Sequence, residues 1–191
     1  MKEYSLKIEA DWMQRLQHND EKALASLMEM YYDDLYNYAS RFTKDDGLIK
    51  DCIQEVFISL WQRRETVGHI LSPKYYFLRA IKNKVLKSLH KNAKRATSAH
   101  LQDEYDFFHE FSIERVIIDK QISEEKASKL IKTLSLLSKR QKEIIYLKYY
   151  QYLDHGQIAE LMNISRQSVY NLLHEAVHNL RSLWHTEFVT H

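Results

Sequence analysis

Hydrophobic positions in the first half of the chain recur at helical spacing. Apolar and aromatic residues return every three or four positions within residues 23–42, 48–61 and 77–89. This period places the apolar side chains of each segment on one face of an α-helix. Asn19 or Asp20 can cap the first segment, whereas Ser72 and Pro73 suit the N-cap and first turn of the third. We therefore predict three amphipathic helices here.

The same period returns after residue 123 and continues almost to the C-terminus. Ser138 with Gln141 forms a capping-box pattern, and Asp154 with Gln157 marks the start of another helix. Asn163 is a residue type that tolerates the left-handed conformation often needed at a tight corner between helices. We predict helices that begin near residues 123, 138 and 154, and a last one capped at residue 165.

Residues 93–122 lose this period and mix Ser, Thr and acids with an aromatic cluster, as is typical of a linker with some local helix. The whole sequence has only 3 Gly and 1 Pro, whereas β-architectures need turn residues at short intervals. The predicted fold class is all-α. We expect two small helical domains, residues 1–92 and 123–191, joined by an acidic linker at 93–122, and the second contains a helix-turn-helix.

The net charge is only +2, but it is unevenly distributed. Every charged residue between Lys74 and Arg95 is basic, whereas acids dominate between residues 103 and 125. The basic run suggests an element that binds a polyanion. A solvated helix face is the alternative interpretation.

Cysteine content and the apolar runs indicate where the protein works. Cys52 is the single cysteine, so it has no thiol partner in the chain, and the first twelve residues lack the apolar core of a secretion signal. No apolar run approaches the about 20 residues needed to span a bilayer. We expect a cytoplasmic protein that is not integral to a membrane.

Residues 157–180 have the pattern of a helix-turn-helix motif. The start of the second helix of such a motif enters the major groove of DNA. The side chains presented there would be Arg166, Gln167, Ser168, Tyr170, Asn171 and His174. An ordinary helical hairpin with a polar outer face is the alternative.

The same helix contains the H-E-x-x-H pattern, in which two His one turn apart hold zinc, as His174, Glu175 and His178. The extended zinc motif is not met, because Arg181 stands where Gly belongs and His185 is one residue late. Three isolated glycines cannot form a phosphate-binding loop either. We expect no metal, no cofactor, no small-molecule substrate and no catalysis, and a zinc hydrolase is kept only as a third alternative.

The third predicted helix combines aromatic and basic side chains. Tyr75, Tyr76 and Phe77 precede the basic run. Rings of this kind can stack on unpaired bases while Lys and Arg contact phosphates, which suits single-stranded nucleic acid. Tyr76 and Phe77 could equally belong to the core.

Together these motifs resemble the bacterial RNA polymerase sigma factors of the extracytoplasmic-function (ECF) group, within the sigma-70 family. Residues 51–64, DCIQEVFISLWQRR, are similar to region 2.2 of the family, and residues 75–91, YYFLRAIKNKVLKSLHK, to regions 2.3 and 2.4. Residues 137–183 are similar to region 4, so the resemblance covers residues 21–183. It implies a transcription initiation factor that binds core RNA polymerase and promoter DNA.

The resemblance also implies which residues act. The polymerase-binding residues would lie on the second predicted helix: Asp51, Gln54, Glu55, Phe57 and Trp61. Of these, Phe57 and Trp61 would mainly support the packing of the helix. The non-template strand of the −10 element would contact Tyr76, Arg79, Lys82, Asn83, Lys84, Lys87 and Lys91. The helix-turn-helix residues named above would recognise the −35 element. A further implied partner is an anti-sigma factor, often membrane-anchored.

Three places depart from the family pattern. Ser138 replaces a usual Pro, residues 154–156 replace a common aromatic and acidic pair, and residues 170–172 replace a more basic stretch. These departures weaken the positive charge of the predicted −35 surface. The leading alternative function is a free-standing helix-turn-helix repressor or activator that dimerises on palindromic DNA without polymerase.

Overall fold

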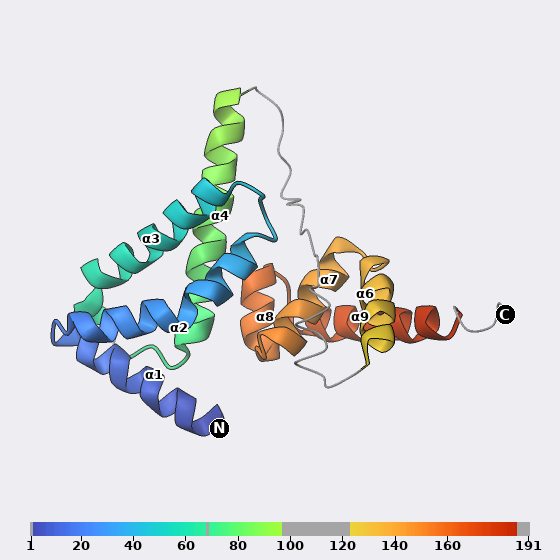
Figure 1. Ribbon diagram of the computed structural model, residues 1–191, viewed down its shortest axis with the longest axis horizontal. Coiled ribbons are helices and arrows are strands. Elements are labelled where there is room, and N and C mark those ends of the chain that lie inside the picture. Colours follow the sequence, from blue (N-terminus) through green and yellow to red (C-terminus); the bar gives the residue numbers. More distant parts are fainter. Residues whose placement is uncertain (1, 68, 97–122, 187–191) are drawn as a thin grey trace. The chain divides into compact units, whose positions relative to one another are not determined.

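The computed structural model of the chain describes residues 2–67, 69–96 and 123–186. These residues form helices and no strand, so the all-α prediction is confirmed (Figure 1). The chain divides into two compact units, Met1–Asp106 and Phe107–His191. The predicted linker at 93–122 lies mostly outside the described residues, and the last helix of the first unit continues past residue 92 to Ala96. Within the described residues, no helix is long and apolar enough to span a membrane.

The first unit contains four α-helices among its described residues: α1 (Lys2–Gln17), α2 (Glu21–Ala39), α3 (Asp46–Gln62) and α4 (Pro73–Ala96), with a short 3₁₀ turn at Arg64–Thr66 (Figure 1). Helix α2 packs against α1, α3 and α4, and α3 packs against α4. The core contains an aromatic cluster in which the Phe77 ring lies 4.8 Å from the Tyr31 ring and 5.2 Å from the Phe57 ring, between centroids.

Capping side chains set where α2 and α3 begin. The Asp20 carboxylate accepts hydrogen bonds from the backbone N–H groups of Lys22 and Ala23. Asn19 instead takes a left-handed conformation with φ 62°, so Asp20 is the cap of α2. The Asp45 carboxylate accepts from the N–H of Leu48. Pro73 occupies the first position of α4, as predicted.

Helix α1 is an element that the apolar period did not predict. It contributes Met13 and Leu16 to the core, but it also buries the charged residue Glu9. The Tyr31 hydroxyl donates a hydrogen bond of 2.6 Å to the Glu9 carboxylate. Burial, and then this carboxylate, raise the pKa of Tyr31 above its ordinary value. Trp12, Met13 and Leu16 recur at helical spacing, but the buried Glu9 interrupts this short apolar face, and the sequence analysis did not assign a helix to it.

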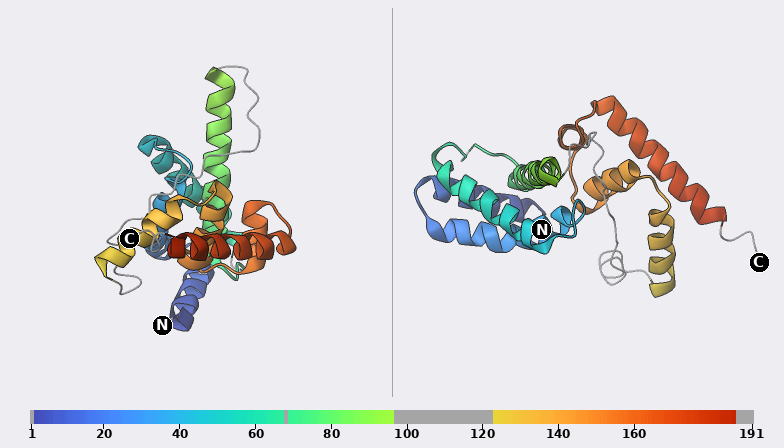
Figure 2. Two further views of the ribbon diagram at one scale, coloured as in Figure 1. Left: turned by 90° about the vertical axis from the view of Figure 1, so that its right-hand side faces the viewer. Right: turned by 90° about the horizontal axis from the view of Figure 1, so that it is seen from above.

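The described part of the second unit contains α6 (Glu124–Ser135), α7 (Lys139–Ile145), a π-helical turn (Tyr146–Tyr150), α8 (His155–Met162) and α9 (Arg166–Thr186). Helices α6, α7 and α8 all pack against the long helix α9 (Figure 2). Both predicted caps are complete capping boxes, Ser138 with Gln141 and Asp154 with Gln157. Asn163 has φ 52° and ψ 51°, which confirms the predicted left-handed corner between α8 and α9.

Candidate polymerase and nucleic-acid surfaces

The outer face of α3 carries the acidic and amide residues that were predicted to bind polymerase. Asp51, Gln54 and Glu55 are all exposed, because positions three and four apart share one helix face. Phe57 is only 2% exposed and packs in the aromatic core, so its role is to support the helix. Trp61 is half-buried beneath the Arg64 guanidinium, which lies 4.6 Å from the ring centroid.

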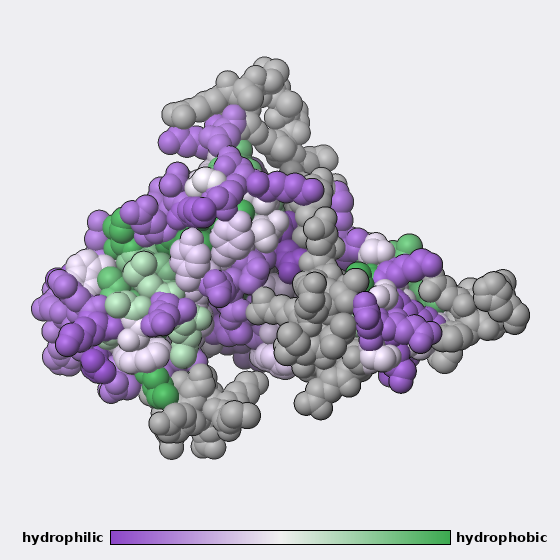
Figure 3. Space-filling model, viewed as in Figure 1, coloured by the Kyte–Doolittle hydropathy of each residue, from purple (hydrophilic) through white to green (hydrophobic). Residues whose placement is uncertain are grey.

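Ile58 lies on the same outer face and is 47% exposed. It is three residues after Glu55, so the stripe is not purely polar. The view in Figure 3 shows a largely hydrophilic surface with apolar patches on the first unit. An apolar residue next to predicted polar contacts is a feature that sequence analysis passed over, because single exposed apolar side chains are common.

Most of the predicted strand-binding residues on α4 are accessible to a ligand. Tyr76 and Lys84 are half-buried, and the exposed members are Arg79, Asn83, Lys87 and Lys91. Burial raises the pKa of the Tyr76 hydroxyl, and its ring lies edge-on to Phe77 at 5.6 Å between centroids. The Arg79 guanidinium donates a hydrogen bond of 3.4 Å to the Tyr75 hydroxyl.

Lys82 differs from these residues in its burial. It is only 5% exposed, and its Nζ lies 5.7 Å from the centroid of the Phe42 ring. Lys82 follows Ile81 and comes four residues after Leu78, so the helical period turns it toward the core together with these apolar neighbours. The structure therefore buries most of the Lys82 side chain, and its contact with a DNA phosphate stays a prediction.

An ion pair joins the predicted polymerase and strand surfaces. The Nζ of Lys84 on α4 donates to the Oε2 of Glu55 on α3 at 2.8 Å. Lys84, followed by the more remote charges of Lys87 and Lys91, lowers the pKa of Glu55 below its ordinary value. The acidic stripe of α3 and the basic stripe of α4 are thus neighbours, a relation that no sequence pattern indicated.

The start of α9 presents the predicted DNA-recognition residues. Ser165 caps the helix, since the Ser168 N–H donates to its Oγ at 3.0 Å. All six candidates are exposed: Arg166, Gln167, Ser168, Tyr170, Asn171 and His174. Two of them form a hydrogen bond, in which the Gln167 amide donates to Asn171 Oδ1 at 3.1 Å.

The H-E-x-x-H residues His174, Glu175 and His178 are exposed on the surface of α9. Among the described residues, no group of three or more His, Cys, Asp or Glu side chains is arranged to hold a metal ion.

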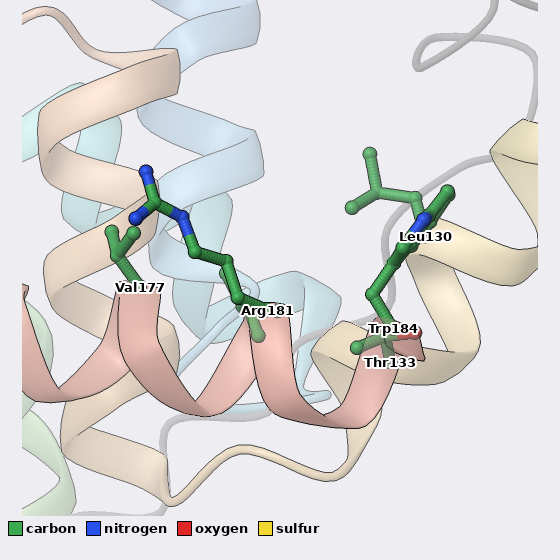
Figure 4. Close-up of a pocket in the computed structure, with 6 residues that line it drawn as sticks. Leu130, Thr133, Val177, Arg181 and Trp184 are labelled. Carbon is green, nitrogen blue, oxygen red and sulfur yellow. The ribbon is translucent and has the colours of Figure 1, made fainter. Parts of the chain in front are cut away.

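The second unit also contains an apolar groove between α6 and α9, with a volume of about 200 Å³ (Figure 4). Figure 4 shows side chains of both helices lining it, and the lining residues are Leu130, Thr133, Val177, Leu180, Arg181 and Trp184. The Lys129 ammonium lies 4.5 Å from the Trp184 ring centroid. The described helices cover several of these apolar side chains only in part.

Comparison with known proteins gives matches on both units. The family model of Sigma-70 region 2 matches residues 27–95, and that of Sigma-70 region 4 matches residues 127–180. The ECF RNA polymerase sigma factor SigL of Mycobacterium tuberculosis is 26% identical over 165 residues, which are 83% of this chain and 89% of that protein.

A solved structure, that of CnrH in complex with the cytosolic domain of CnrY, has a similar fold. It aligns with a TM-score of 0.56 and 15% identity, covering 94% of this chain and 98% of the other. The two family matches fall on the two helical units, in the order in which the sequence motifs occur. The chain belongs to the sigma-70 family and is a promoter-recognition sigma factor of the ECF group.

Proposed function

We propose that the two units divide promoter recognition between them. The first unit binds core RNA polymerase through the outer face of α3 and holds the opened non-template strand of the −10 element along α4. The second unit recognises the duplex −35 element with the start of α9. The protein itself catalyses no reaction.

The observation that carries this proposal is the arrangement of α3. Asp51, Gln54 and Glu55 are exposed together on one face, whereas most apolar residues of the same helix are buried on the other and Ile58 is the exposed exception. Because these polar side chains contribute little to the core, folding does not require them, and they are available to contact the polymerase. Carboxylates and amides in this position suit a basic, hydrogen-bonding surface on the polymerase.

For the strand, α4 supplies exposed cations at intervals of one or more helical turns, in Arg79, Lys87 and Lys91. Cations at such intervals can contact successive phosphates. Asn83 adds both donor and acceptor groups for a base edge, and the half-buried Tyr76 offers a ring for stacking.

For the duplex, the exposed start of α9 has the chemistry of direct readout. Arg166 suits guanine, and Gln167 or Asn171 suits adenine. The hydrogen bond between Gln167 and Asn171 limits their movement before DNA binds.

In vitro transcription tests the proposal. Core polymerase from a matching host is supplied with genomic DNA fragments, with and without this protein. We expect discrete new transcripts that are lost with Glu55→Lys. Glu29→Lys makes the same charge change at an exposed position of α2 and should keep the transcripts. If the intact chain gives no transcripts with active core enzyme, the proposal fails and the free-standing DNA-binding regulator becomes the better explanation.

We further propose a cytoplasmic location and regulation by an anti-sigma factor. The similar structure of CnrH contains the cytosolic domain of CnrY, which supports a partner of this kind. Co-expression with an inhibitor encoded at a neighbouring locus should abolish binding of this chain to core polymerase. Unchanged binding would eliminate that inhibitor candidate.

A further inference from the structure

Two residues at the start of α8 contact the DNA-recognition face of α9. The rings of His155 and Tyr170 meet edge to face, with centroids 4.3 Å apart and planes at 64°. Tyr170 remains 54% exposed, so this contact holds one side of the ring and leaves the rest accessible.

The next residue, Gly156, contacts a second recognition side chain. A Cβ atom built on Gly156 would lie 3.0 Å from Nη2 and 3.4 Å from Cζ of Arg166. The Arg166 guanidinium therefore lies directly against the Gly156 backbone. The same Cβ would lie 3.1 Å from Oδ1 of Asp154, so a larger residue here would shift the guanidinium and this carboxylate by a few tenths of an ångström.

These contacts involve the two departures from the family pattern that lie in the helix-turn-helix or directly before it. His155 and Gly156 belong to the altered 154–156 stretch, and Tyr170 belongs to the altered 170–172 stretch. Arg166 and Tyr170 are four residues apart, so they are neighbours on one face of α9. His155 and Gly156 of α8 thus lie against Tyr170 and Arg166 of α9.

We propose that His155 and Gly156 are positioning residues for −35 recognition, because the His155 ring packs against Tyr170 and Gly156 leaves the space in which the Arg166 guanidinium lies before DNA binds. This inference rests on the proposed role of α9 in the −35 contact. Arg has several rotatable bonds, and ordering a long side chain on binding costs conformational entropy. A side chain already held in place loses less entropy on binding and favours the base that matches its fixed geometry.

The test uses holoenzyme formed from full-length protein and core polymerase, with promoter templates randomised across the upstream element. Transcripts are sequenced to give the base preference at each position. We expect His155→Ala and Gly156→Ala to reduce the upstream preference by at least threefold at one or more positions, while the preference in the −10 element stays unchanged. His178→Ala, an exposed His on α9, is the matched control and should keep the wild-type preference.

Rescue separates positioning from a general loss of stability. His155→Phe keeps a ring against Tyr170 and should restore the preference that His155→Ala loses. Tyr170→Leu removes the same contact from the other side, so the double variant His155→Ala/Tyr170→Leu should be no worse than Tyr170→Leu alone. This cycle compares preferences rather than total transcript, so it stays informative if one variant is less stable.

Wild-type base preferences in His155→Ala and Gly156→Ala would overturn the inference while leaving the proposed function intact. Failure of His155→Phe to restore the preference would overturn the role of the ring contact. A holoenzyme that initiates but shows no upstream preference at all would instead refute the −35 role of α9, and the inference with it.

Discussion

Lys82 and Lys87 of α4 have the same charge and different surroundings. Lys82 is buried next to Phe42, whereas Lys87 is exposed. We expect Lys87→Met to weaken binding of a single-stranded −10 oligonucleotide severalfold, because each phosphate contact also releases counterions from the DNA. Lys82→Met keeps the apolar stem and should change the affinity less than twofold. Fluorescence anisotropy at several salt concentrations measures both.

The salt dependence of the affinity is the control for the comparison of Lys87→Met with Lys82→Met. Loss of a phosphate contact lowers the slope of affinity against salt by about one unit, so the slope should fall for Lys87→Met and stay unchanged for Lys82→Met. An equal fall in both variants would mean that Lys82 leaves its buried site to contact the strand.

The ion pair between Glu55 and Lys84 predicts how stability depends on pH. Lys84 lowers the pKa of Glu55 below its ordinary value of 4.5. The folded state is therefore stabilised at pH values above 4.5, and this contribution disappears as the pH falls through the lower, folded-state pKa. Both side chains are partly exposed, so the contribution at pH 7 is at most about 1 kcal/mol.

Urea unfolding of Glu55→Gln at pH 7 and at pH values below 4.5 measures this effect. The variant should be less stable than wild type at pH 7, and the difference should shrink on acidification. Asp51→Asn removes an exposed carboxylate of the same helix and should show a smaller difference at pH 7. A difference for Glu55→Gln that grows as the pH falls would contradict the pairing.

At the scale of elements, the corner between α8 and α9 depends on one backbone conformation. Asn163 has a positive φ of 52°, which costs most L-residues about 1–2 kcal/mol. We expect Asn163→Val to destabilise the second unit by about that amount, since a β-branched side chain tolerates this conformation poorly. Asn163→Gly removes the Cβ and should be nearly neutral. Thermal unfolding followed by circular dichroism compares the two, and equal losses would show that the Asn side chain, rather than the backbone conformation, matters.

This corner also shows why some elements are predictable from sequence. Asp154, Asn163 and Ser165 are local signals, and each acts within a few residues of its own position. Helix α1 instead has a short apolar face and a buried Glu9 that is paired with the distant Tyr31. Elements specified by local caps and apolar period were predicted, whereas those that depend on tertiary contacts were not.

The π-helical turn is the second element of this kind. Gln151 is buried just after it, and its amide donates a hydrogen bond of 2.7 Å to the Tyr146 hydroxyl. The apolar period does not indicate this turn, because it cannot show that a polar side chain will be paired inside the unit. The same reason explains the candidate sites. Spacing predicted the exposed stripe of α3 and also places Lys82 with Leu78 and Ile81 on the inner face of α4, whereas the pair between Glu55 and Lys84 depends on the packing of two helices.

At the scale of the whole molecule, each unit has its own buried core. Tyr31, Phe57 and Phe77 lie in the first, whereas Ile144, Leu147 and Val169 are buried in the second. A unit with a separate core is expected to fold without the other. Covalent connection then contributes by raising the effective concentration of one unit near the other's binding site.

Separate production of residues 1–96 and 123–191 tests this division of labour. We expect both pieces to be helical and to unfold cooperatively, and the first piece alone to bind core polymerase. Equimolar pieces at micromolar concentration should support much less initiation from −35-dependent promoters than the intact chain, because tethering supplies an effective concentration of about millimolar. Raising the second piece toward millimolar concentration should recover part of the activity. Full activity at micromolar concentration would show that the connection is dispensable, and a first piece that folds but does not bind polymerase would show that the polymerase contact requires both units.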